Sequence, residues 1–199
     1  MDLKSPDEQG SLTTSRYRPD DGRTVVVSTD AALSGPLADR FAIGCSVEVE
    51  GRGEVAACAA DIPCPPWWTT ACAERCAALE GLLYARTLTT GPVVLRTDDR
   101  SLLAVLSGEG RHREAPPTSP AGFAVSELVR AIREVTSDFD SFRVEWVPRE
   151  LNRRADALAA HGSGLRMRPE RDFRVVPVRG LWARRQGEPQ PLLLRLDWF

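Results

Sequence analysis

The amino-acid sequence predicts an α/β protein with a mixed sheet of five strands and helices on both of its faces. Three strand-like segments come first, and glycines between the second and third suit a tight antiparallel hairpin. Helical and strand-like segments alternate afterwards, as they do where helices connect parallel strands. With 199 residues, 42% of them hydrophobic, the chain is large enough for one such core.

The first elements are the strands of the hairpin and a long helix. TVVVSTD, residues 24–30, predicts a buried strand because three consecutive valines leave no polar face. Two further strands are expected over 40–51 and 53–63. The prolines of CPPWW, residues 64–68, fit neither a helix nor a central strand, so this segment is expected to be a loop. The helix that follows, residues 69–85, can be capped by Thr69 or Thr70.

The second half of the chain predicts two alternating units. GPVVLRTDD is a strand, and Asp99 is placed to cap the short helix that follows it. A loop of about fifteen residues separates this helix from an amphipathic one, and loops of this length usually have a function or move. The last strand and helix complete the core. From Gly91 onward the expected segments are a strand over 91–99, a helix over 100–108, the loop over 108–122, a helix over 123–139, a strand over 142–148 and a helix from Arg149.

Composition places the protein among ordinary globular chains. Five cysteines form no paired framework, and Cys72 and Cys76 share the apolar stripe of their helix, so they are expected to be small buried hydrophobes rather than metal ligands. No apolar run approaches the roughly 20 residues that span a bilayer, and residues 1–22 contain no apolar signal segment. We therefore expect a disordered N-terminal extension over 1–22 and a cytoplasmic protein without a membrane partner.

Positive charge is concentrated in a C-terminal extension, residues 163–199. From Gly162 onward the chain has eight arginines against four acids, although its net charge is −2. Aromatic residues are interleaved with these arginines. The extension is therefore expected either to contact a nucleic-acid backbone or to pack on the domain, and the sequence favours neither. A protein partner is a further alternative, because the end of the extension, PLLLRLDWF, is apolar.

Four acids stand at comparable places on four elements. Asp30 and Asp98 are expected at strand ends, Glu74 in the first turns of a helix, and Asp156 in the first half of the last helix. Carboxyl ends of parallel strands share one sheet edge, so the four can converge. Singly, each is more often a cap or a surface residue. Together they would repel one another, and Mg²⁺ is the usual ion that removes such repulsion.

Four segments that carry these acids resemble, in order and spacing, the ribonuclease H family, and in particular its bacterial branch with a short loop before the last helix. The segments are VVVSTDAAL, CAERCAALEGLLYA, VVLRTDDRSLLAVL and VEWVPRELNRRADALAA, and the resemblance covers residues 24–162. It implies a ribonuclease H-like domain over 23–162. It also implies a metal-dependent endonuclease that hydrolyses the RNA strand of RNA–DNA hybrids.

The resemblance further implies a role for each of the four acids. Two Mg²⁺ ions are expected, for which Mn²⁺ can substitute. Asp30 would bridge both ions, Glu74 and Asp98 would hold one of them, and Asp156 would help to hold the other. Glu80 matches a recurrent acid of the family and is expected to be structural. Asp99 is expected to be a helix cap, and Arg149 and Glu150 are expected to belong to the loop and the helix start without a chemical role.

The chain also departs from the family pattern at positions that contact substrate. Ala31 stands where the family commonly has glycine, and Thr69 and Thr70 replace asparagines that contact the hybrid. The loop before the last helix has no histidine. Two alternatives therefore stay open beside the ribonuclease H activity. One is another nuclease of the same superfold, and the other is a non-catalytic module that binds nucleic acid or protein.

Overall fold

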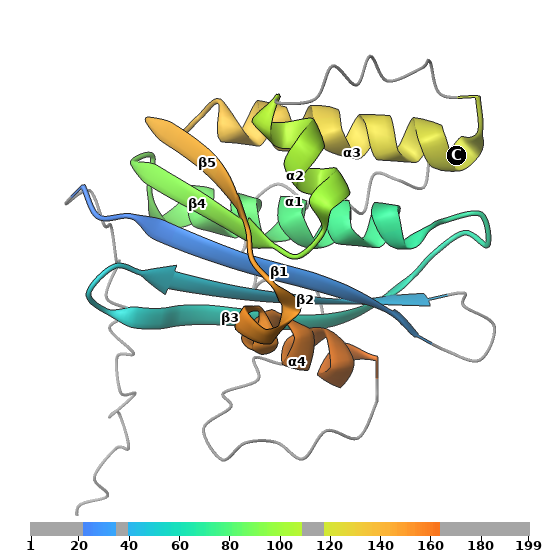
Figure 1. Ribbon diagram of the computed structural model, residues 1–199, viewed down its shortest axis with the longest axis horizontal. Coiled ribbons are helices and arrows are strands. Elements are labelled where there is room, and N and C mark those ends of the chain that lie inside the picture. Colours follow the sequence, from blue (N-terminus) through green and yellow to red (C-terminus); the bar gives the residue numbers. More distant parts are fainter. Residues whose placement is uncertain (1–21, 35–39, 109–117, 164–199) are drawn as a thin grey trace, which may run out of the picture.

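The computed structural model describes residues 22–34, 40–108 and 118–163, which form a five-stranded sheet flanked by helices (Figure 1). The predicted extensions therefore lie outside the described residues, apart from Gly22 and Ser163. None of the helices in the described ranges combines the length and the apolar composition needed to cross a membrane.

The order of elements agrees with the sequence prediction. The strands are β1 (Val25–Ser34), β2 (Arg40–Val49), β3 (Gly53–Pro63), β4 (Pro92–Thr97) and β5 (Ser141–Trp146). The helices are α1 (Thr70–Leu88), α2 (Arg100–Ser107), α3 (Pro120–Thr136), the 3₁₀ turn η1 (Arg149–Leu151) and α4 (Arg153–Gly162).

The sheet is mixed, with strand order β3-β2-β1-β4-β5. β2 pairs antiparallel with β1 on one side and with β3 on the other, whereas β4 and β5 run parallel to β1. Gly51 and Gly53 both adopt a φ of 75° in the turn between β2 and β3, a conformation that costs glycine little. The expected hairpin and the expected parallel units are both confirmed.

Helices cover both faces of the sheet, and two consecutive residues of β2 show why. Side chains alternate between faces along a strand. Cys45 points toward α1, where its Sγ donates to the Ala77 carbonyl over 3.2 Å. Gly44 faces the backbone of α4 on the other side. Figure 1 shows α1, α2 and α3 above β1, β2 and β3, and α4 below these strands.

Apolar side chains between α1, α3 and the sheet make the larger core. Val27, Leu95, Leu79 and Leu128 are buried there with at most 2% of their surface exposed. Burial of such side chains stabilises the fold by about 25 cal/mol for each Å² of apolar surface removed from water. Cys72 joins the same cluster and Cys76 does too, so the expectation that these thiols act as buried hydrophobes is confirmed.

The structure corrects three local expectations. Asp30 does not end β1, because the strand continues to Ser34 by pairing with β2 alone. The last helix begins at Arg153 rather than at Arg149, since η1 interrupts the helical phase and leaves Leu151 75% exposed. Thr69 is the N-cap residue of α1, but its hydroxyl makes no capping hydrogen bond.

Candidate active site

Asp30 lies where β1 extends past its parallel neighbour. The last pair between β1 and β4 joins Ser28 to Arg96, and β4 ends one residue later. Asp30 therefore has β2 on one side, opposite Gly44, and the end of β4 on the other. The residue is only 6% exposed. Asp30 is thus largely shielded from solvent, next to the point where β4 ends.

Asp98 follows β4 directly and is held by neighbours on two sides. The Trp146 indole N–H donates to the Asp98 carbonyl oxygen over 3.0 Å. The Asn152 amide donates to the Asp98 Oδ1 over 3.3 Å and to the Thr29 carbonyl over 2.9 Å. Asn152 is buried at the start of α4, so one amide fixes that helix to β1 and to the end of β4.

The neighbouring Asp99 serves as the N-cap of α2, as expected. Its carboxylate accepts from the Ser101 N–H over 2.7 Å and from the Ser101 hydroxyl over 3.0 Å. Arg75, buried on α1, also donates to Asp99 over 3.4 Å. Because these bonds occupy both of its oxygens, Asp99 is structural and orients the connection that carries Asp98.

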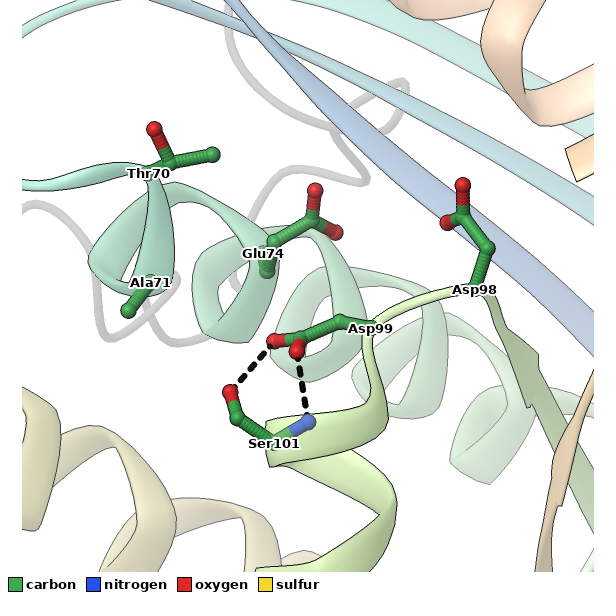
Figure 2. A pocket seen from close by; sticks show the side chains of 6 residues that line it. All are labelled: Thr70, Ala71, Glu74, Asp98, Asp99 and Ser101. Atoms are coloured by element: carbon green, nitrogen blue, oxygen red, sulfur yellow. Dashed lines mark hydrogen bonds between the residues drawn. The ribbon is translucent and has the colours of Figure 1, made fainter.

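Glu74 extends from α1 toward the end of β4, where Asp98 lies (Figure 2). The two residues line an open cleft of about 290 Å³, with Thr70, Ala71, Asp99 and Ser101 completing the lining. Glu74 is only 8% exposed, and its Oε2 has no hydrogen-bond partner among the described residues. A buried carboxylate oxygen without a donor is costly, so this atom marks a place for a cationic or protic ligand.

The carboxylates influence one another strongly. Burial, then the charges of Asp98 and Asp156, raise the pKa of Asp30 from 3.8 to about 7. Burial, then the charges of Asp30, Asp98 and Asp99, raise the pKa of Glu74 from 4.5 to about 9. Asp30 is therefore the acid that interacts electrostatically with each of the other three.

Asp156 lies in the first turn of α4 and forms an ion pair with Arg149 of η1. Asp156, and then Asp30 and Asp98, raise the pKa of the Arg149 guanidinium. In return, the positive charge of Arg149 offsets part of the rise in the pKa of Asp30. A positive charge from the loop before α4 therefore lies beside the acidic group, a contact that the sequence analysis did not assign to this residue.

Three positions expected to bind substrate have different surroundings. Thr70 lines the cleft. The Thr69 hydroxyl lies 3.6 Å from the Cys72 Sγ at the start of the helix. Ala31 packs its methyl group against the small apolar cluster around Ile43, and its backbone N–H lowers the pKa of Asp30 and of Glu74. Their expected contact with a substrate stays a prediction.

The carboxylate oxygens of the four acids are of the type that binds divalent cations, but the acids are not spaced closely enough to hold one ion together. Across residues 22–34, 40–108 and 118–163, no three carboxylate, imidazole or thiol groups stand close enough to coordinate one ion. The unpaired Glu74 oxygen and the raised pKa values nevertheless favour the binding of positive charge. Hard oxygen ligands of this kind suit Mg²⁺ or Mn²⁺.

In a chelating buffer, the free energy of unfolding is expected to fall between pH 5 and pH 9. The pKa values of Asp30 and Glu74 are raised in the folded protein, so in this window the unfolded chain binds fewer protons, and a higher pH favours unfolding. Each pKa unit corresponds to about 1.4 kcal/mol. Mg²⁺ should reduce the pH dependence. Urea denaturation at pH 5, 7 and 9, in chelator and in Mg²⁺, measures the free energy of unfolding under each condition. A free energy of unfolding that does not change with pH in chelator would contradict the raised pKa values.

A mixed β3-β2-β1-β4-β5 sheet with α1 and α4 on opposite faces is the ribonuclease H-like fold. Residues 42–162 match the family model described as reverse transcriptase-like, and because this match spans more than half of the sequence, the chain belongs to that family. No curated protein matches the chain. The expected assignment to the ribonuclease H family is thereby confirmed, while its bacterial branch stays a prediction.

Solved structures are similar over most of their own lengths. RNase H1 from the halophilic archaeon Halobacterium salinarum NRC-1 is 25% identical, with a TM-score of 0.58, and the match covers 70% of this chain and 96% of that one. The N-terminal RNase H domain of a Mycobacterium tuberculosis protein is 21% identical, with a TM-score of 0.58 over 71% and 94%. LC11-RNase H1, in complex with an RNA/DNA hybrid, is 19% identical, with a TM-score of 0.56 over 70% and 96%. The last two show the fold alone.

Proposed function

We propose that this protein is a divalent-metal-dependent endonuclease that hydrolyses the RNA strand of RNA–DNA hybrids. The observation that carries the proposal is the mutual charge interaction of Asp30, Glu74, Asp98 and Asp156 beside an open cleft. These acids come from β1, α1, the end of β4 and α4, so only the folded chain brings them together. Two of the four, Asp30 and Glu74, are buried, and interacting buried carboxylates are destabilising without bound cations, which favours catalysis over a structural role.

The four acids have distinct roles in this proposal. Asp30, at the centre of the group, would be shared by two Mg²⁺ or Mn²⁺ ions. Glu74 and Asp98 would hold one ion, and Asp156 would help to hold the other. Two such ions lower the pKa of an attacking water and neutralise charge on the leaving oxygen of a phosphodiester.

The surrounding residues orient the acids and the substrate. Asn152 keeps the Asp98 carboxylate directed toward the cleft through its amide N–H. Thr70 lines the cleft, and its hydroxyl is of a kind that can bond to a ribose 2′-OH, the group by which a protein distinguishes RNA from DNA. Ala31 and Thr69 would lie along the same strand of the hybrid.

A cleavage assay tests the proposal directly. RNA labelled at its 5′ end is annealed to DNA or to RNA, or left single-stranded, and incubated with protein and Mg²⁺, Mn²⁺ or a chelator. Internal cuts in the hybrid alone, which require a divalent ion and leave a 3′-hydroxyl, are the expected result. Cleavage of other substrates instead would indicate another nuclease of the same superfold.

A non-catalytic binding module is the second candidate. It is favoured by the absence, within the described part of the chain, of three ligating groups spaced for one ion. The departures at Ala31, Thr69 and Thr70 also favour it. A hybrid that is bound but not cut with either metal would support this reading. The extension over 163–199, a cytoplasmic location and a protein partner stay predictions of the sequence.

Replacing Arg149 with alanine is expected to shift the acid limb of the pH–rate profile toward higher pH. Arg149 lowers the pKa of Asp30, so its removal makes the deprotonated carboxylate harder to form. Rates measured from pH 5 to 9 at saturating Mg²⁺ give the shift. Arg86→Ala is the control, since Arg86 pairs with Asp138 at the far end of α1. An unchanged acid limb would remove Arg149 from the site.

A further inference from the structure

The end of β5 is joined to the connection that carries Asp98. The Val147 N–H donates to the Thr97 carbonyl over 3.0 Å, and the Trp146 indole N–H donates to the Asp98 carbonyl over 3.0 Å. The second bond comes from a side chain, so it can be removed without altering the strand pairing. The Trp146 side chain therefore contacts the backbone of one proposed metal ligand.

The same indole ring supports a positive charge. The Arg100 guanidinium lies over the Trp146 ring, 4.5 Å from its centroid, a distance typical of a cation–π contact. Arg100 is exposed and Trp146 is 37% exposed, so the pair lies on the surface. Asp99 and Ser101, the neighbours of Arg100 in the chain, both line the cleft. The stacked pair is thus at the rim of the proposed active site.

We propose that Trp146 is a positioning residue for Asp98 and that Arg100, stacked on its ring, binds a backbone phosphate of the nucleic acid at the rim of the cleft. The inference rests on the proposed function, since it concerns the substrate of the same site. A cluster of carboxylates repels a phosphodiester, and a nearby guanidinium offsets that repulsion. Stacking fixes the plane of the guanidinium while its N–H groups remain able to donate to phosphate oxygens.

Two substitutions separate the two roles of the pair. Trp146→Phe keeps an aromatic face for Arg100 but removes the indole donor. Arg100→Gln removes the charge but keeps the indole bond to Asp98. Arg86→Gln is the matched control, because Arg86 is a half-exposed arginine about 18 Å along α1 from Glu74, at 1.5 Å per residue.

The two variants are expected to differ in kcat and in binding. Trp146→Phe should lower kcat about 10-fold, since small displacements of a catalytic group cost rate rather than affinity, and hybrid binding should stay within about twofold. It should also weaken Mg²⁺ binding in calorimetry. Arg100→Gln should leave kcat at saturating hybrid unchanged, raise the hybrid Kd several-fold, and reduce the slope of log K against log salt by about one.

The Asp98→Asn background provides the decisive comparison. There the effect of Trp146→Phe on Mg²⁺ affinity should disappear, because the ligand that it positions is already altered, whereas the Arg100→Gln effect on hybrid binding should persist. A Trp146→Phe effect that survives in this background, or an unchanged salt slope in Arg100→Gln, overturns the inference. If the wild type cuts no hybrid, the proposed function fails, yet the Mg²⁺ affinities and salt slopes still decide the roles of Trp146 and Arg100.

Discussion

Asp98→Asn is expected to reduce hybrid cleavage at least about 1,000-fold, which corresponds to about 4 kcal/mol of transition-state stabilisation. The substitution removes the charge of one proposed ligand but keeps the shape of the side chain. Its oxygen can still accept from Asn152, so the local structure should be retained. The assay is single-turnover cleavage of labelled hybrid at saturating Mg²⁺.

The same substitution should stabilise the protein in chelator. Asp98 contributes to the raised pKa values of both Asp30 and Glu74, so its neutralisation relieves repulsion in the metal-free state. Activity and stability therefore move in opposite directions, which a misfolded variant cannot reproduce. Asp99→Asn is the matched control. Asparagine can also cap a helix, so that variant is expected to keep most of its activity, with lower stability from the lost Arg75 pair.

Gly44→Ala is expected to destabilise the fold by about 3 kcal/mol or more, because overpacking at a close contact forces backbone shifts. A Cβ at this position would lie 2.2 Å from the Ala155 carbonyl oxygen and 2.4 Å from the Ala159 nitrogen. Both atoms are backbone, so no side-chain rotation relieves the overlap and α4 must move. Because α4 carries Asp156, cleavage should fall as well.

Urea denaturation measures the loss at Gly44. Gly91→Ala is the control, because its Cβ would meet only the Thr89 hydroxyl, at 3.1 Å, and a cost within about 1 kcal/mol is expected. Equal unfolding free energies for Gly44→Ala and the wild type would contradict the close approach of α4 to β2.

The order of the elements along the chain and the mixed sheet follow from local sequence patterns, and the fold class was predicted on that basis, whereas the strand order of the sheet was not. Valine-rich β1, the glycine hairpin and the stripe through Leu79 each specify one element without reference to the others. The length of β1 could not be predicted in the same way, because residues after Asp30 stay extended only through pairing with β2. The start of the last helix was expected at Arg149 rather than at Arg153, because the 3₁₀ turn η1 is not distinguishable from a helical turn by local sequence.

The four acids could be proposed from the sequence because carboxylates at comparable places on several elements, together with the resemblance to ribonuclease H, form a recognisable pattern. Arg149, Asn152 and Trp146 form no such pattern. Asn152 and Trp146 act through contacts with residues distant in the chain, and the charge of Arg149 reaches Asp30 only in the folded protein. The Asn152 amide, for example, reaches a carbonyl 123 positions earlier. A buried asparagine immediately before a helix is the one local signal that could have suggested its role.

This long-range bond has a consequence for the order of synthesis. Three of the four acids leave the ribosome well before Asn152, yet the amide that ties Thr29 to Asp98 belongs to one of the last elements of the domain. A nascent chain that ends before α4 lacks this tie, and Asp156 as well. Under the proposed function, the complete acidic site is therefore expected to form only late in translation, after α4 has been made.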